Sequence, residues 1–262
     1  MIEVAKRSAV HGNGCIGYTV RMTIIDDNSK LHIACDHKRR SEDVNCAECA
    51  IRHRMLFEGI DVEQAGVLLN PVKHIWFEPG DIIYRQGDDP RALYSVRNGI
   101  IKLSLLSEDG TLRIVRLMSA GSAIGLEALL GEYYQHTAEA LTDADLCVLP
   151  PTTIETLGKQ QPVLCKRLMG QWQRQVAQAD EYLLKLSTGS IKDRVIALLQ
   201  DLDRLCRDGE IVFQLPSNPD IAALVASRVE SVSRIMAEFK REGVLRKEGK
   251  GGWMLTLHPS QA

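Results

Sequence analysis

Three polar side chains near the end of the chain, Glu230, Ser233 and Arg234, have the types and spacing needed to read DNA bases. An arginine can donate two hydrogen bonds to O6 and N7 of guanine, a glutamate can accept one from N4 of cytosine, and a serine can bond a base or a phosphate. On a helix these positions share one face. The set therefore predicts a helix in the DNA major groove, with Arg228 just before it as a further contact. The alternative is an ordinary amphipathic helix packed in a core.

Two short predicted helices must position this face. The first begins at Ser217, a residue type that caps helices, and has Pro219 in its first turn. A tight turn follows at 226–228. The second helix turns its apolar residues away from the polar set, and these are Val229, Val232, Ile235, Met236 and Phe239. Residues 243–257 then alternate, turn on glycines and alternate again, which predicts a hairpin and so a winged helix-turn-helix.

Charge is distributed in a way that suits DNA. From Arg228 to Lys250 there are seven Lys or Arg residues against four Asp or Glu, although the whole chain has a formal net charge of −2. Phosphate contacts need local positive charge and not a basic protein. The balance therefore favours a DNA-binding tip on an otherwise neutral molecule.

The cysteines offer a second kind of chemistry. Cys46 and Cys49 have the spacing of paired metal ligands, and with Cys35 and His37 they could form a closed tetrahedral zinc site. Cys147 is typical of a buried residue on a strand, which needs no metal. Two cysteines on predicted helices are expected in cores, and these are Cys165 and Cys206.

The middle of the chain changes its pattern twice. Residues 72–150 form short alternating segments separated by glycine turns, which predicts an antiparallel barrel or sandwich.

A helical period follows, with a long helix at 162–186 and a hinge at 188–190. Its apolar seam comprises Leu164, Leu168, Trp172, Val176, Ala179 and Leu183. Within the seam, Leu168, Trp172 and Val176 are the candidate dimerisation residues, because so long a seam favours helix-to-helix association. The alternative is that the helix packs on its own barrel.

Composition limits the remaining classes. A hydrophobic content of 45% and a charged content of 25% are ordinary for a globular protein. No apolar run approaches the roughly 20 residues of a membrane span, and the N-terminus lacks a secretory signal pattern, so we expect a cytoplasmic protein. The seven histidines are scattered, and there is no phosphate loop or nucleophile elbow, so we do not expect an enzyme.

In the order of its elements the chain resembles the CRP/FNR family of transcription regulators, over residues 45–257. The resemblance also includes the Asp193-Arg194 pair and the turn glycines, which are Gly80, Gly87, Gly99, Gly121 and Gly125. It implies an α+β fold with a cyclic-nucleotide-binding-type β-roll, a long dimerisation helix and a winged helix-turn-helix. The implied divisions are an irregular extension at 1–45, a sensor domain at 46–158, the dimerisation helix at 159–187 and the DNA-binding domain at 188–262.

The resemblance also implies how DNA is read. Family members are homodimers that place one recognition helix on each half of a palindrome, as two-fold symmetry requires. Glu230, Ser233 and Arg234 match the Glu-x-x-Ser-Arg pattern of the FNR branch. We therefore expect a half-site of the TTGAT type, with RNA polymerase as the protein partner that the family implies.

The expected signal follows from two further matches. Members that bind cAMP use a Glu in a Gly-Glu-Leu stretch and an Arg before Ser/Thr-Ala, whereas here Leu126 and His136 stand at those positions, so we expect no cAMP binding. In the FNR branch, N-terminal cysteines and one cysteine of the roll hold a [4Fe–4S] cluster. Here Met55 replaces the third N-terminal cysteine. Cys35, eleven residues before Cys46, could replace it if the chain loops back, which gives the candidate set Cys35, Cys46, Cys49 and Cys147. The sequence thus predicts an oxygen or redox sensor, with a structural zinc or no metal as alternatives.

Overall fold

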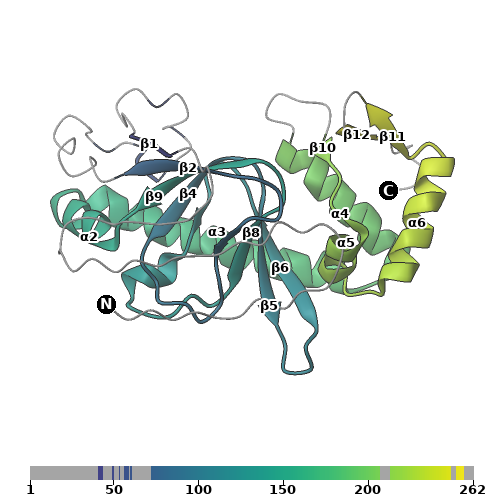
Figure 1. The fold of residues 1–262 in the computed structure, drawn as a ribbon, viewed down its shortest axis with the longest axis horizontal. Helices are drawn as coiled ribbons and strands as arrows, with labels where there is room; N and C mark the ends of the chain where they lie inside the picture. The colour runs from purple at the N-terminus through teal and green to yellow at the C-terminus, as the bar shows by residue number, and fades with distance from the viewer. Residues whose placement is uncertain are drawn as a thin grey trace, which may run out of the picture. The chain divides into compact units, whose positions relative to one another are not determined.

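The computed structural model describes residues 41–43, 49, 53, 56–58, 60, 72–206, 213–248 and 252–256 of the 262 residues. All of them belong to one compact unit, which begins at Ser41. Figure 1 shows a β-roll, a long helix and a smaller C-terminal domain of helices with a small sheet. No helix in this part of the chain is long and apolar enough to cross a membrane.

Two antiparallel sheets form the roll. The first has the order β1 (Ser41–Asp43), β2 (Lys73–Phe77), β9 (Ala144–Leu149), β4 (Leu93–Asn98) and β7 (Ala123–Ile124). The second has the order β3 (Ile82–Tyr84), β8 (Thr137–Ala140), β5 (Ile101–Leu106) and β6 (Leu112–Met118). Apolar side chains of both sheets meet in one buried cluster, as the alternating sequence predicts. Strand β1 was not predicted, because its three residues lie in a stretch that we expected to be irregular up to residue 45.

The turn between β4 and β5 depends on a glycine. Gly99 has φ 86°, and a Cβ at this position would collide with the carbonyl oxygen of Asp143. Only glycine combines this left-handed conformation with so close an approach of another backbone. The Asn98-Gly99 pair therefore sets the reversal that brings β5 into the second sheet.

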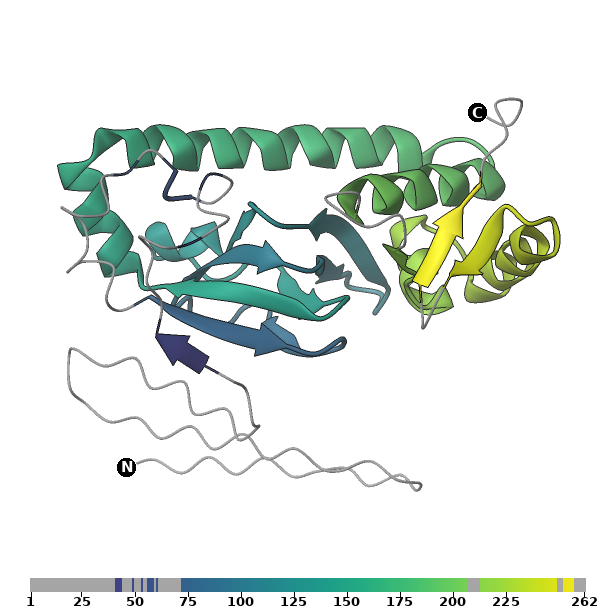
Figure 2. The same cartoon turned by 90° about the horizontal axis from the view of Figure 1, so that it is seen from above.

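A helical layer covers one end of the roll. Helix α2 (Pro151–Gln160) and the 3-10 helix η3 (Leu126–Leu129) pack together with α3 (Pro162–Ser187), which is the predicted long helix. Ile154, Leu157 and Leu164 are fully buried in a cluster that also contains Cys147. Figure 2 shows α3 running as one uninterrupted helix along the roll. Its N-terminal end is thus fixed on the sensor domain.

The C-terminal domain follows a short hinge. Helix α4 (Ile191–Cys206) begins after Ser190, whose hydroxyl accepts from the backbone N–H of Asp193 (3.2 Å), while the Asp193 carboxylate accepts from the N–H of Ser190 (3.3 Å). This reciprocal cap fixes the start of the domain. The other elements are β10 (Phe213–Gln214), α5 (Asn218–Leu224), α6 (Val229–Arg241), β11 (Leu245–Glu248) and β12 (Gly252–Leu255). Strand β10 pairs with β12, so the predicted hairpin is part of a three-stranded sheet.

Candidate DNA-binding face and sensor site

Helices α5 and α6 form the helix-turn-helix at the positions that the sequence predicts. The Ser217 hydroxyl accepts from the backbone N–H of Asp220 (3.2 Å), which is the predicted N-cap. In the turn, Ala226 has φ 55°, a left-handed conformation that non-glycine residues seldom adopt. Arg194 of α4 donates to the carbonyl oxygen of Val225 at 2.6 Å. The half-buried guanidinium of Arg194 thus stabilises the turn. This contact, together with the cap formed by Asp193, gives both residues of the Asp193-Arg194 pair a structural role.

Helix α6 buries one face and presents another. Val232, Met236 and Phe239 are at most 1% exposed and anchor the helix in the domain core. The predicted base-reading residues lie on the exposed side with Arg228, and these are Glu230, Ser233 and Arg234. In the described part of the chain their side chains make no hydrogen bond or ion pair. The face is therefore open to an external partner.

Val229 differs from its prediction. We expected this residue in the core, but its side chain is 41% exposed at the first position of α6. The helix begins here, so the residue has no preceding turn to pack under. An exposed apolar group at the N-terminal end of a recognition helix can contact the methyl group of thymine. Periodicity alone could not reveal this, because it assigns every apolar position to the buried face.

The wing and its neighbours add positive charge beside α6. Lys240 at the end of α6 lies over the ring of Trp253 in β12, with its Nζ 4.7 Å from the ring centroid. Arg246 and Lys247 are exposed on β11. These cations lie near the reading face and suit the DNA phosphates.

Only part of the predicted seam of α3 packs on the roll. Leu164 is buried and Leu168 is half-buried, and both pack on the apolar cluster beneath the roll. Trp172, Val176 and Leu183 are instead 45%, 55% and 64% exposed. The exposed residues lie at helical spacing and form a stripe along one side of the helix. The exposed part of the seam therefore begins at Trp172.

Glutamines attach the buried side of α3 to the roll. The side-chain amides of Gln171, Gln175 and Gln178 donate to the carbonyl oxygens of Gly121, Ala123 and Leu117, at 2.6, 2.7 and 2.9 Å. Each hydrogen bond satisfies a backbone acceptor that the helix would otherwise cover. This contact is polar, and the apolar seam gave no sign of it.

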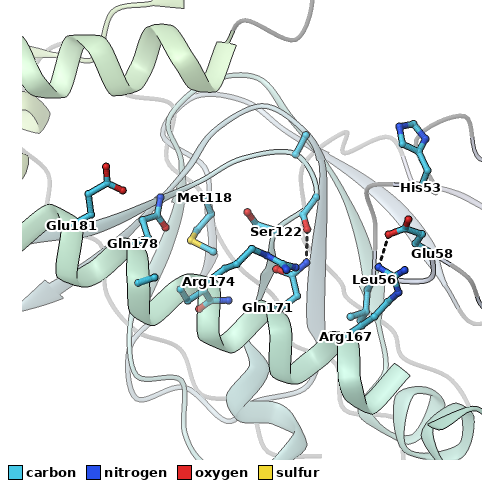
Figure 3. A pocket seen from close by; sticks show the side chains of 14 residues that line it. His53, Leu56, Glu58, Met118, Ser122, Arg167, Gln171, Arg174, Gln178 and Glu181 are labelled. Atoms are coloured by element: carbon cyan, nitrogen blue, oxygen red, sulfur yellow. Dashed lines mark hydrogen bonds and ion pairs between the residues drawn. The ribbon is translucent and has the colours of Figure 1, made fainter. Parts of the chain in front are cut away.

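A pocket of about 640 Å3 lies along α3. Figure 3 shows Arg167, Arg174 and Glu181 of α3 on one wall, with Arg167 paired to Glu58. At about 100° per residue these three positions lie across the helix from Trp172. A partner that contacted α3 only through the exposed stripe would therefore not cover this pocket.

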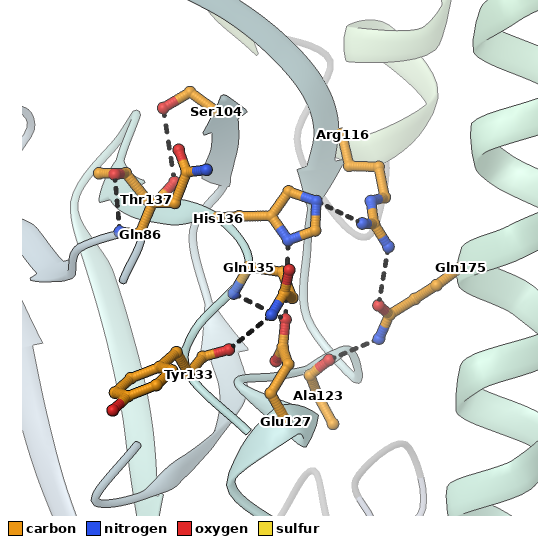
Figure 4. Close-up of polar contacts among 10 residues, drawn as sticks. All are labelled: Gln86, Ser104, Arg116, Ala123, Glu127, Tyr133, Gln135, His136, Thr137 and Gln175. Carbon is orange, nitrogen blue, oxygen red and sulfur yellow. Dashed lines mark hydrogen bonds and ion pairs between the residues drawn. The ribbon is translucent and has the colours of Figure 1, made fainter. Parts of the chain in front are cut away.

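A charged network joins the roll to α3 (Figure 4). Arg116 of β6 donates to Nε2 of His136 at 2.8 Å and to Oε1 of Gln175 at 3.2 Å. On the other side of the imidazole ring, Nδ1 of His136 lies 3.7 Å from Oε1 of Glu127. Because Nε2 accepts from Arg116, the neutral ring carries its proton on Nδ1, facing the carboxylate. The guanidinium, imidazole and carboxylate form one internally paired chain.

Electrostatics agree with this pairing. Burial acts to raise the pKa of Glu127, but hydrogen bonds from His136 and from the backbone N–H of Gln135 outweigh it and hold that pKa below its ordinary value. Burial lowers the pKa of Arg116, and the charge of Glu127 opposes the shift. The network therefore holds a cation and an anion together beneath α3.

Arg116 is a residue that the sequence analysis missed. We expected no arginine at this site because His136 stands where cAMP-binding members have one, yet Arg116 of β6 reaches the imidazole of His136. No linear motif joins the two, because they are brought together only by the pairing of β6, β5 and β8. His136, one of the two positions compared with the cAMP-binding members, is thus bridged within the protein.

The cysteines are described only in part. Cys147 is 5% exposed, and Leu56, Phe57 and Ile60, which follow the cysteine pair in sequence, belong to the same apolar cluster. Cys49 is half-buried. Cys35 and Cys46, and the zinc alternative at His37, lie outside the described residues. Among the residues that are described, no group of three or more Cys, His, Asp or Glu side chains could hold a metal.

One cysteine prediction is wrong. We expected Cys165 in a core, but it is exposed on the first turn of α3. Its neighbour Leu164 faces the roll, so the next side chain points outward. Cys165 is seven residues before Trp172 and shares its side of the helix. The side chain of Cys206 at the end of α4 lies outside the description.

Comparisons with known proteins agree with this architecture. The cyclic nucleotide-binding domain model matches residues 74–161, and the Crp-like helix-turn-helix domain model matches residues 193–259. The transcriptional regulator LdrP of Thermus thermophilus is 30% identical over 184 residues, which cover 69% of this chain and 91% of that protein. The fumarate and nitrate reduction regulatory protein of Vibrio cholerae is 26% identical over 214 residues, which cover 79% of this chain and 85% of that protein.

Solved structures give the same result. The crystal structure of a CRP-family transcriptional regulator from Thermus thermophilus matches with a TM-score of 0.60 and 30% identity, over 69% of this chain and 90% of that one. The chain therefore belongs to the CRP/FNR family. It is a DNA-binding transcription regulator and not an enzyme.

Proposed function

We propose that the protein acts as a homodimer that binds a palindromic DNA site, with α6 of each protomer in the major groove of one half-site. The observation that carries this proposal is the open face of α6, where Glu230, Ser233 and Arg234 are exposed and have no partner among the described residues. Arg234 reads a guanine, Glu230 a cytosine, and Ser233 a base or phosphate. Val229 contacts a thymine methyl. The resemblance to the FNR branch supports half-sites of the TTGAT type.

The exposed stripe of α3 supplies the dimer contact. Met169, Trp172, Val176 and Leu183 are 73%, 45%, 55% and 64% exposed, which is unusual for so many large apolar groups on one helix. A second copy of α3 would cover them through the same residues, as a two-fold axis requires. Leu168 lies at the edge of this contact, between the roll and the partner helix.

Trp172→Asp tests the dimer and the DNA site together. The new carboxylate would be buried without a partner in the interface, so we expect a monomer in sedimentation and a loss of specific DNA affinity of roughly 100-fold or more. Gln173→Asp is the control, because it adds the same charge at an exposed position one residue further along the helix. If the Trp172→Asp protein remains dimeric, the exposed stripe of α3 is not the dimer contact. If the wild-type protein does not prefer the palindrome over random DNA, the proposed DNA site is wrong.

We also propose that the effector state is read through a thiolate centre formed by Cys35, Cys46, Cys49 and Cys147. The four thiolates have the donor chemistry of a [4Fe–4S] cluster. Support comes from Cys147, which is buried on β9 in the same apolar cluster as Leu56, Phe57 and Ile60, residues that follow Cys49 in the sequence. When bound, the cluster would supply sensitivity to oxygen. Cys147 and Cys49 would tie the N-terminal segment to the sheet that carries β9.

Anaerobic purification tests this second proposal. About four iron and four sulfide per chain are expected, with loss on exposure to air and absence from a Cys46→Ser variant. Cys165→Ser is the matched control, since this exposed cysteine is outside the set. Zinc without sulfide would favour the structural site of Cys35, His37, Cys46 and Cys49. Colourless, metal-free protein whose DNA binding ignores oxygen would leave a regulator with another effector.

The absence of cAMP regulation stays a prediction. The internal network supports it, because Arg116 is engaged by His136 and Gln175, and Glu127 faces His136. A cyclic phosphate would have to displace these contacts. Calorimetry should give no affinity tighter than millimolar, and submicromolar binding would overturn the prediction.

A further inference from the structure

The roll also makes direct contact with the helix-turn-helix. Ile114 and Leu117 of β6 and Ile100, just before β5, are 4%, 0% and 3% exposed. They belong to the same buried cluster as Ile221 and Leu224 of α5. Figure 1 shows α5 beside β6, the strand of Ile114 and Leu117. The sensor domain and the DNA-binding domain therefore share one hydrophobic core.

A lysine lies at this contact. Lys102 of β5 has a side chain only 8% exposed, and its Nζ lies 2.6 Å from Oδ1 of Asp220 on α5. The same ammonium lies 2.9 Å from Oε1 of Glu139, its cross-strand neighbour on β8. Burial acts to lower the pKa of Lys102, but the two carboxylates outweigh it and raise that pKa, so the group stays charged.

Asp220 links this ion pair to the cap of α5. Its Oδ1 binds Lys102, whereas its Oδ2 accepts from the Ser217 hydroxyl at 2.6 Å. One carboxylate therefore fixes both the start of α5 and its attachment to the roll. The contact uses α5 and leaves the reading face of α6 exposed.

We propose that Lys102 is a positioning residue for DNA binding, which locks the helix-turn-helix onto its own sensor domain through Asp220 and so fixes the direction in which α6 points. This deepens the proposed DNA-binding function and rests on it. Without the lock, the domain would move about the hinge at 188–190, where Gly189 has φ 80°. A change in the roll would then reach the DNA-binding domain through β5 and β6, in addition to α3.

A double-mutant cycle tests the lock in the full-length protein. Lys102→Met removes the ammonium, Asp220→Asn keeps the shape of its partner, and the double variant closes the cycle. Each single variant should raise the Kd for the palindrome about tenfold. This is the change expected if the helix-turn-helix keeps its DNA-binding orientation in only about a tenth of the molecules. The double variant should be little worse than either single one. Lys185→Met is the control, since its exposed ion pair with Glu181 lies within α3.

Amide hydrogen exchange provides a readout that needs no DNA. Amides of β5 and α5 should exchange about tenfold faster in Lys102→Met and Asp220→Asn, while those of β9 stay protected. Ser217→Ala separates the two duties of Asp220, because it removes the cap and leaves the ion pair. It should raise exchange in α5 alone and be additive with Lys102→Met.

Each outcome decides the proposal. Faster exchange in β5 and α5 with weaker palindrome binding supports the lock. Unchanged exchange, additive effects of Lys102→Met and Asp220→Asn, or faster exchange with equal or tighter DNA binding overturns it. If the wild-type protein does not prefer the palindrome, the proposed DNA site fails, whereas the exchange result still decides whether Lys102 joins the domains.

Discussion

The polar residues of α6 and those beneath α3 have opposite surroundings. Glu230, Ser233 and Arg234 project from a well-anchored helix and have no partner in the described part of the chain. Arg116 and His136 are about as polar, yet they pair with each other inside the protein, and Glu127 faces the same imidazole. Exposed polar side chains that lack a partner and project from a well-anchored helix indicate that an external ligand binds there. Polar side chains that already pair with each other indicate a contact within the protein. The exposed face of α6 therefore indicates an external partner, whereas the network beneath α3 does not.

Of the substitutions that test this difference, Arg234→Ala should have the largest effect, which is on the free energy of specific DNA binding. If the side chain reads a guanine, specific binding should weaken by about 1–3 kcal/mol, and the preference at one base pair of each half-site should relax. Arg241→Ala is the control, because this arginine is two turns further along the same helix, away from the end that contacts bases. Titrations against the palindrome and random DNA measure both. An equal loss on the two DNAs would contradict base reading by Arg234.

Gln175→Ala should have a smaller effect, confined to the roll. It removes the hydrogen bond to Ala123 and one of the two side-chain acceptors of Arg116, so the free energy of unfolding should fall by about 1–2 kcal/mol. Gln173→Ala, on the exposed side of the same helix, should change it by less than about 0.5 kcal/mol. Urea unfolding separates the two. If both variants are equally stable, the network does not hold α3.

Glu127→Gln should give the smallest effect, visible in its pH dependence. The folded-state pKa of Glu127 is lowered from 4.5, so its ionised form stabilises the fold at neutral pH, and that stability is lost as the pH falls below 4.5 through the lowered value. The stability gap between wild type and Glu127→Gln should therefore be present at pH 7 and shrink on acidification. Glu132→Gln, at an exposed position shortly after η3, the 3-10 helix that carries Glu127, is the control. A gap that stays constant with pH would show that ionisation is not involved.

The helix-turn-helix was predictable because its signals are local. The Ser217 cap, the apolar spacing of α6 and the glycine turns are each encoded within a few residues. The long helix was also predictable, but its faces were not separated, because Leu164 and Trp172 are equally apolar and only the position of the roll distinguishes them. Cys165 was misassigned for the same reason.

The polar contacts of the sensor domain were not predictable. Arg116 lies on β6, His136 in the bend before β8 and Gln175 on α3, and these segments meet only in the folded chain. Lys102 reads as an ordinary polar position of an alternating strand, yet α5 covers it. Such pairings depend on strand register and on domain contact, which leave no local pattern in a single sequence.

The turn at Ala226 has a consequence for how this chain tolerates change. A left-handed alanine costs about 1 kcal/mol relative to glycine, and a β-branched side chain would cost more. The angle between α5 and α6 is therefore maintained against a small local cost, supported by the guanidinium of Arg194 on the carbonyl of Val225. Glycine at 226 would relieve this cost and make the Arg194 hydrogen bond less important to the turn, whereas valine would raise the cost and make that hydrogen bond more important.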